Sequence, residues 1–134
     1  VIECGYDVSS SCCVFEGDVI PNSLARIEIA GRELDTYLIR LLNERGYRFN
    51  EQSTIDNFIA RDIKESLCEV CSDSGSALAE AKRDAPAEDY DTASRGNNLL
   101  PGYEKKQFPD RLTIGEERFQ CPEALFNPTV YVGK

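Results

Sequence analysis

Residues 31–46 contain the full set of signals for an amphipathic helix, and this segment constrains the fold more than any other. Large apolar residues recur at intervals of three or four positions, the spacing that places side chains on one face of a helix: Leu34, Tyr37, Leu38, Leu41 and Leu42. Glu33 and Asp35 lie in the first turn, and Arg45 precedes a glycine at the end. Early acids, a late cation and an exit glycine all stabilise a helix. We therefore expect a helix over residues 32–45 that packs its leucine-rich face on a core.

A second helix is predicted over residues 54–70. Its start is marked by Ser53, a capping residue type, and by Asp56 three positions later. Aliphatic side chains then repeat every fourth position, at Ile55, Ile59, Ile63 and Leu67. An alanine-rich run predicts a third helix over residues 76–83, by helix propensity rather than by packing, because it contains a single large apolar residue.

The residues before the first helix are typical of short strands. Residues 1–4 and 11–16 read as strands joined by a turn at residues 5–7, and a second turn follows at residues 16–18. Charged and apolar residues alternate over residues 25–30, as in a strand with one wet face. The pattern predicts a three-stranded meander that leads directly into the first helix.

Residues 84–109 are rich in proline and glycine, so we expect a long surface loop without regular structure. The acidic run over residues 84–91 fits a solvated segment. Four apolar residues within the loop have two interpretations, because they could contact a partner or pin the loop to its own domain. These candidates are Leu99, Leu100, Tyr103 and Phe108.

After the loop, alternation around Gly115 and Glu116 predicts a β-hairpin over residues 111–121. Pro122, followed by an acid, is expected to begin a helical turn. The tail over residues 129–134 has the β-branched and aromatic composition of a strand.

Four blocks, in the same order, resemble the actin superfamily: residues 15–21, 30–47, 61–68 and 112–128. The resemblance implies an α/β fold, more narrowly an α+β segment of the actin-like ATPase fold, in which a β-meander leads into a small helical subdomain with a β-hairpin. Residues 1–30 would be part of inner subdomain 3, residues 31–121 would be outer subdomain 4, and residues 122–134 would return toward subdomain 3. Complete actins are far longer than 134 residues, and the chain contains no methionine, so we expect a segment of a longer protein.

The turn after Glu3 resembles a phosphate loop of actin but departs from its pattern. The family turn reads acid, small residue, glycine, aspartate, glycine; here Tyr6 replaces the aspartate and Asp7 replaces the second glycine. A carboxylate 4 Å from a phosphate charge costs about 1 kcal/mol in water and about 4 kcal/mol at a protein-like dielectric. A left-handed backbone at Asp7 would add about 1–2 kcal/mol. We therefore expect weakened or lost nucleotide binding, with Glu3 as at most an outer neighbour of a metal ion.

The adenine side matches the family better. The resemblance implies nucleotide contacts from six residues: Gly5, Gly31, Arg32, Arg61, Lys64 and Glu65. Other interpretations stay open for three of them. Gly31 could serve only the strand-to-helix turn, and Lys64 and Glu65 could be helix residues that contact no ligand.

The net charge of -9 and the pI near 4.5 argue against a nucleic-acid partner, because phosphate backbones are bound mainly by clustered lysine and arginine. No apolar run reaches membrane-spanning length, and no signal-peptide pattern opens the chain, so no membrane partner is expected. We expect a cytoplasmic or nuclear cytoskeletal protein whose partners are other actin-family chains or actin-associated proteins.

Six cysteines are present, and the resemblance places Cys68 and Cys121 where actins also carry cysteine. Cys68 and Cys71 have zinc or redox spacing, but they are a single pair in a chain without histidine. We expect no metal site, and cysteines that behave as small apolar residues.

Together these features predict an actin-like cytoskeletal or complex-scaffold segment that acts through protein–protein contacts. The segment is expected to be no enzyme, to have no catalytic residue and to bind no cofactor of its own. The alternative is the outer lobe of an ATP-binding, ATP-hydrolysing actin whose other half is missing from this chain. ATP and magnesium would then belong to the full-length parent.

Overall fold

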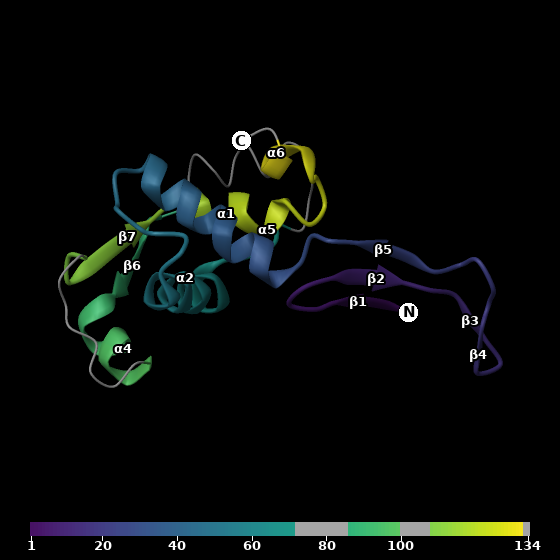
Figure 1. The fold of residues 1–134 in the computed structure, drawn as a ribbon. Coiled ribbons are helices and arrows are strands. Elements are labelled where there is room, and N and C mark those ends of the chain that lie inside the picture. The colour runs from purple at the N-terminus through teal and green to yellow at the C-terminus, as the bar shows by residue number, and fades with distance from the viewer. Residues whose placement is uncertain (72–85, 100–107, 133–134) are drawn as a thin grey trace.

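The computed structural model describes residues 1–71, 86–99 and 108–132, and it divides into a thin β arm and a helical body (Figure 1). Five short strands make the arm: β1 (Ile2–Cys4), β2 (Ser9–Ser11), β3 (Val14–Phe15), β4 (Asp18–Val19) and β5 (Ala25–Ile27). The body contains α1 (Gly31–Glu44), α2 (Thr54–Leu67), β6 (Glu88–Asp91), α4 (Thr92–Leu99), β7 (Arg111–Ile114), α5 (Glu117–Glu123) and α6 (Thr129–Val132).

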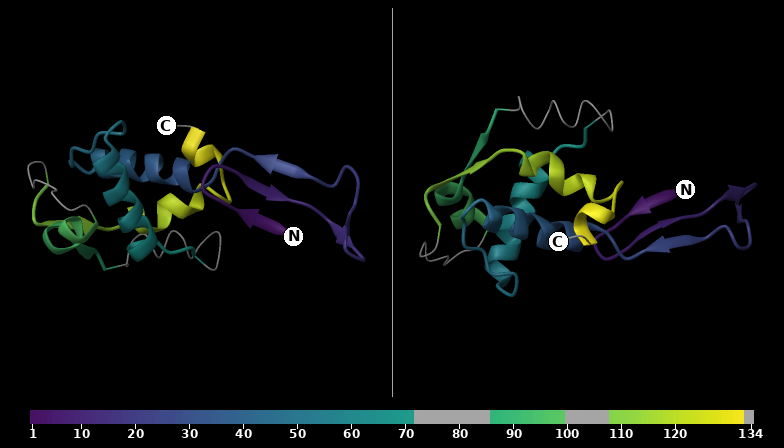
Figure 2. Two further views of the ribbon diagram at one scale, coloured as in Figure 1. Left: turned by 60° about the horizontal axis from the view of Figure 1, so that its bottom comes forward. Right: turned by 90° about the horizontal axis from the view of Figure 1, so that it is seen from above.

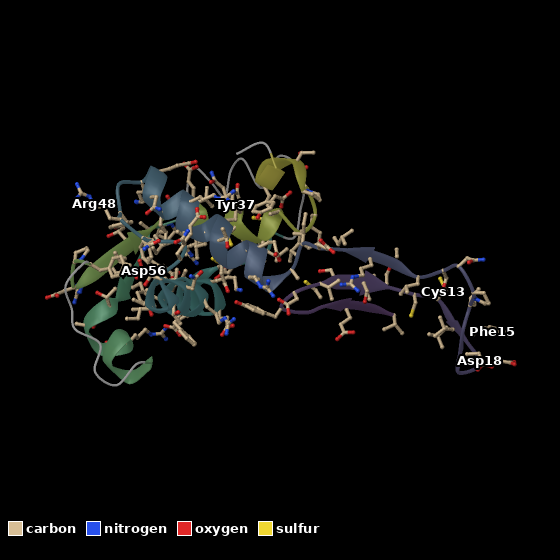
Figure 3. All side chains as sticks on the ribbon, in the orientation of Figure 1. Cys13, Phe15, Asp18, Tyr37, Arg48 and Asp56 are labelled. Atoms are coloured by element: carbon tan, nitrogen blue, oxygen red, sulfur yellow. The ribbon has the colours of Figure 1, made fainter. Side chains whose placement is uncertain are left out.

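The arm is an antiparallel sheet in the order β1-β2-β5, extended by the β3–β4 hairpin. The hairpin turn uses two left-handed residues, Glu16 with φ 49° and Gly17 with φ 92°. No residue from 1 to 29 is buried, so the arm has no core of its own. It projects from the body in each view of Figure 2, and Phe15 and Asp18 lie at its far end in Figure 3.

The two long helices form the centre of the body. All five apolar residues of the predicted α1 face are buried, and Ile39 joins them. On α2, Ile59 and Ile63 are buried while Ile55 is 39% exposed, so the buried stripe begins one turn later than the sequence pattern indicates. The Ser53 side chain accepts a hydrogen bond from the Asp56 backbone N–H at 3.3 Å, which is the predicted cap.

The hairpin expected over residues 111–121 is wrong. Strand β7 pairs instead with β6, in a register that places Tyr90 opposite Leu112, and residues 117–123 form helix α5. The Glu117 carboxylate accepts the Gly115 N–H at 2.8 Å. The backbone N–H groups of residues 118–120 donate to the carbonyls of residues 115 and 116. These local bonds start a helix where a returning strand was expected.

Three related expectations also fail. Residues 84–109 are not a loop throughout, because their described part contains β6 and α4. Pro122 lies inside α5 rather than at a helix start, and described residues 129–132 of the tail are helical as α6. Strand β6 has one inward residue, Tyr90, among acidic neighbours, which explains why composition suggested a solvated loop. The helix expected over residues 76–83 lies outside the described residues.

The structure gives the positions of two of the four loop residues that were candidates for partner contact. Phe108 is buried and stacks on Phe49 with ring centroids 4.3 Å apart, so it pins its segment to the body and is wrong as an exposed docking residue. Leu99 ends α4, and Leu100 and Tyr103 lie outside the described residues.

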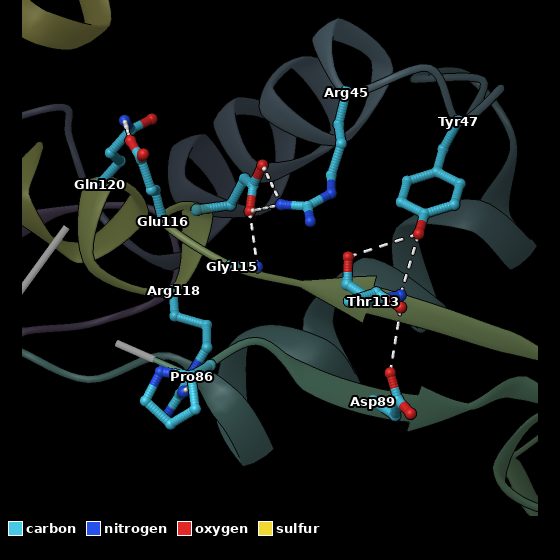
Figure 4. A network of polar contacts seen from close by, with 10 residues as sticks. Arg45, Tyr47, Pro86, Asp89, Thr113, Gly115, Glu116, Arg118 and Gln120 are labelled. Carbon is cyan, nitrogen blue, oxygen red and sulfur yellow. Dashed lines mark hydrogen bonds and ion pairs between the residues drawn. The ribbon is translucent and has the colours of Figure 1, made fainter. Parts of the chain in front are cut away.

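Polar contacts join α5 to the elements around it (Figure 4). Arg118 is buried, and its guanidinium donates to the carbonyls of Leu67 and Pro86 at 2.8 and 3.3 Å. The same group pairs with Glu88 on β6 at 2.9 Å. Arg118 therefore ties the end of α2 and strand β6 to α5. Within the described ranges, no helix is long and apolar enough to cross a membrane.

Candidate functional site

The turn between β1 and β2 lies against the start of α1 (Figure 1). The backbone N–H of Gly31 donates to the Gly5 carbonyl at 3.0 Å, and the N–H of Arg32 donates to the Tyr6 carbonyl at 2.8 Å. These are the first two N–H groups of α1, which have no acceptor within the helix. Free N–H groups at a helix start bind anions such as phosphate. Here two of them already bind the chain's own carbonyls.

Gly31 allows this close contact. A Cβ atom at Gly31 would lie 3.3 Å from Cδ2 of Tyr6 and 3.4 Å from the Gly5 carbonyl oxygen. A larger residue would push the turn away from the helix. The contact gives Gly31 a purely structural reason to be glycine, which is one of the two interpretations that the sequence left open.

The side chains of the turn bind two arginines. Asp7 forms an ion pair with Arg32, and both side chains are more than half exposed. The Arg61 guanidinium lies over the Tyr6 ring, 4.3 Å from the ring centroid. The Arg32 guanidinium lies 5.6 Å from the same centroid. The left-handed backbone expected at Asp7 is wrong, because Glu16 and Asn22 are the non-glycine residues with positive φ in the described chain. The cost expected from backbone strain at Asp7 is therefore absent, and the cost expected from its charge remains.

A buried carboxylate holds the cations on α2. Asp35 is 2% exposed, and its two oxygens lie 2.6 Å from Nζ of Lys64 and 3.5 Å from Nε of Arg61. Among the residues that the structure describes, neither oxygen has a well-aligned hydrogen-bond donor, so the carboxylate depends on these two cations. Lys64 also donates to the Gly31 carbonyl at 2.9 Å. Burial opposes the charge of Arg61, but Tyr6 and Asp35 together raise its pKa above the ordinary value.

Comparison with known proteins decides the family. The family model described as "Actin" matches residues 1–134, which is the whole chain. The chain is also 35% identical over 133 residues to a curated Dictyostelium discoideum protein named "Putative actin-29". The chain belongs to the actin family. Its α+β architecture of helices and small antiparallel sheets agrees with an actin-family segment.

This actin-family chain is much shorter than its relative. The match covers 97% of the chain but 30% of the Dictyostelium protein. The chain therefore spans about a third of the length of that protein.

Five of the six residues that the actin resemblance singled out lie together. Gly5, Gly31, Arg32, Arg61 and Lys64 meet where the β1–β2 turn contacts α1 and α2. Glu65 follows Lys64 on α2 but is exposed. Glu3 lies on β1, along a different hollow of about 420 Å³ that the sheet shares with Leu125 and Phe126. A second hollow, of about 330 Å³, is lined by Tyr6, Arg32 and Arg61 with Thr36, Glu51, Thr54, Asn57 and Phe58.

Asp35 is the residue that sequence reasoning missed. Its position in the first turn suggested only a favourable charge at the helix start. The signal that could have identified it is its place beside Leu34 and Leu38, inside the apolar face of the actin-family helix. A carboxylate on a buried face needs a cation, and Arg61 and Lys64 are three residues apart on the facing helix.

The cysteines of this actin-family chain are free thiols in the described residues. Cys121 is buried and donates to the Leu34 carbonyl at 3.4 Å. A hydrogen bond with Cys68 and burial raise the pKa of the Cys121 thiol, which makes it a poor nucleophile. No group of three metal-ligating side chains occurs among the residues that the structure describes, Cys68 and Cys71 included.

The charged and N–H groups of this site are paired within the chain. Asp7 pairs with Arg32, and the N–H groups at the start of α1 donate to the β1–β2 turn. Lys64 and Arg61 are turned toward Asp35 and Tyr6. The same residues that would face an anion are thus bound to the chain itself.

Proposed function

We propose that this chain is part of an actin-like cytoskeletal or complex-scaffold protein that acts through protein–protein contacts, with nucleotide binding weakened or lost. The carrying observation is the internal occupation of the site: Arg32 pairs with Asp7, and Lys64 pairs with Asp35. With Arg61, which also contacts Asp35, the site has three cations and two carboxylates. One net positive charge is left to attract a polyanionic phosphate. We place the protein in the cytoplasm or nucleus, with actin-family chains or actin-associated proteins as partners.

The uncovered arm supports a role in assembly. Ile2 and Val1 are 87% and 77% exposed, and Phe126 lies beside the same sheet and is also exposed. Apolar surface of this kind is normally covered. Since the chain spans 30% of its relative, we propose that residues 1–30 belong to an inner subdomain completed by other parts of an actin-family protein. Residues 31–121 would be the outer subdomain and residues 122–134 the return segment.

We also propose that the segment is no ATPase by itself. Phosphoryl transfer requires a metal ion, an oriented water and groups that stabilise the moving charge. Two carboxylates near the turn are already paired with cations, Asp7 with Arg32 and the buried Asp35 with Lys64. No catalytic residue is assigned.

A second candidate is the outer lobe of an ATP-hydrolysing actin. It is favoured by the convergence of Gly5, Gly31, Arg32, Arg61 and Lys64 at one place, which the family resemblance implies for a nucleotide site. ATP and Mg²⁺ would be held between this lobe and a half of the fold outside the chain. Glu3 would then lie in the outer surroundings of the metal ion.

The test is co-sedimentation of the full-length parent protein with filamentous actin, with and without MgATP, together with phosphate release. We expect association that MgATP leaves unchanged, and no phosphate release above that of actin alone. Absence of association with actin filaments would overturn the scaffold proposal. Phosphate release that Glu3→Gln abolishes would replace it with the second candidate, whereas Asp18→Asn, an acid at the far end of the arm, serves as the matched control (Figure 3).

A further inference from the structure

We propose that Tyr6 and Asp7 form an internal latch that occupies the anion-facing side of α1 and α2 and holds the β1–β2 turn closed in place of a ligand. This inference rests on the proposed loss of nucleotide binding and adds the reason for it. The latch is defined as Tyr6 and Asp7 with their partners Arg32 and Arg61.

Backbone hydrogen bonds attach the β1–β2 turn to the start of α1. The two hydrogen bonds from the N–H groups of Gly31 and Arg32 to the carbonyls of residues 5 and 6 hold the turn on the helix start. Across the turn itself, the Gly5 N–H donates to the Val8 carbonyl at 3.0 Å. The turn therefore approaches α1 through carbonyl oxygens, which repel an anion, rather than through free N–H groups.

The two latch side chains provide a negative charge and an aromatic ring, the two features of an aromatic anion. Asp7 supplies the negative charge to Arg32, and Tyr6 supplies a ring face to Arg61. Asp35 restrains Arg61 from the buried side and keeps Lys64 directed into the protein. An incoming anion would have to displace Asp7 from Arg32 and would gain little from Lys64.

The contacts that keep the latch closed are weak. The Arg32 and Asp7 side chains are 56% and 61% exposed, so water and salt reach their ion pair. Exposed ion pairs and cation–π contacts of this kind each change an equilibrium by about two- to five-fold. Opening therefore requires only the loss of a few weak contacts, and the charge of Asp7 controls it.

The test is hydrogen exchange at the amides of Gly31 and Arg32 in the full-length parent protein, measured with and without MgATP. The main variant is Tyr6→Asp combined with Asp7→Gly, which removes both latch side chains and restores the turn that the family resemblance describes. Asp18→Gly makes the same change of acid to glycine at the far end of the arm and is the matched control.

We expect both amides of the wild-type chain to be protected without ligand and unaffected by MgATP. The double variant should exchange about five- to twenty-fold faster without ligand and regain protection when MgATP is added. Exchange in Asp18→Gly should equal that of the wild type. Exchange in the double variant that equals the wild type would overturn the latch while leaving the proposed function intact. Saturable protection of the wild type by MgATP would instead overturn the proposed function.

A milder variant keeps the proposal testable if the double variant unfolds. Asp7→Asn preserves the shape of the side chain and removes its charge. In the wild type, raising NaCl from about 0.05 M to about 0.5 M should speed exchange at Arg32, because salt screens the Asp7–Arg32 pair. In Asp7→Asn that salt response should disappear. An equal salt response in the two proteins would contradict a latch controlled by Asp7.

Discussion

Removal of the Lys64 ammonium should destabilise the fold strongly, because it leaves a buried carboxylate without its nearest cation. Asp35 is 2% exposed, and Lys64 lies 2.6 Å away, compared with 3.5 Å for Arg61. Breaking a buried pair from one side typically costs about 3–5 kcal/mol. Arg61 remains to balance part of the charge, so we expect Lys64→Met to lower the free energy of unfolding by about 3 kcal/mol.

Replacing both partners should cost much less. The double variant Asp35→Leu with Lys64→Met removes both charges of the close pair, and Arg61 is 34% exposed and keeps its contact with the Tyr6 ring. Buried pairs can be replaced by apolar side chains at a cost near zero. The Lys64 bond to the Gly31 carbonyl is lost in either case, which we expect to cost about 1 kcal/mol. The double variant should therefore be more stable than Lys64→Met alone.

Urea unfolding followed by circular dichroism measures all four proteins of this cycle. We expect a coupling free energy of about 2 kcal/mol between the two positions. Glu65→Gln, at an exposed neighbouring position on α2, should change stability by less than about 0.5 kcal/mol. Additive losses, or a loss below about 1 kcal/mol for Lys64→Met, would refute the buried-pair interpretation.

Two further predictions concern the rest of the body. Arg118→Met should lower the free energy of unfolding by about 2–4 kcal/mol, because it removes a buried guanidinium that binds two carbonyls and two carboxylates. Arg111→Met, at an exposed position, is the control. It should lower the free energy of unfolding by less than about 0.5 kcal/mol in the same urea titration. Burial and the hydrogen bond to Asp62 raise the pKa of Tyr90. The stability that this phenol contributes is complete below about pH 10 and is lost at higher pH, so Tyr90→Phe should flatten the decline of stability in alkaline solution. Equal alkaline slopes in the two proteins would contradict this assignment.

Local signals predicted the parts of the fold whose stability is local. Helix α1 was expected because its apolar spacing, charges and exit glycine agree, and the predicted face is the buried one. The β6–β7 pair could not be found in this way, because its register joins segments about 24 residues apart and β6 has a single apolar residue. The helix propensity of residues 117–123 was hidden by an alternating pattern that is too short to distinguish a strand from one helical turn.

The sequence named residues that the structure brings together, but it did not indicate how they contact one another. The resemblance to actin identified the arginines and Lys64, yet no sequence pattern indicated that the chain's own side chains bind them. Asp35 and Tyr6 determine that outcome through contacts across α1, α2 and the β1–β2 turn. Contacts of this kind depend on how elements pack, which periodicity along one element cannot report.

The most direct measurement of the central claim is a titration of the ¹⁵N-labelled full-length parent protein with MgATP, followed through the amide resonances of Gly31 and Arg32. Because both amides already donate to the β1–β2 turn, we predict that neither resonance shifts up to about 1 mM MgATP, the level of weak binding. Saturable shifts of both resonances at micromolar MgATP would show that the helix start is open to the nucleotide and would contradict the account.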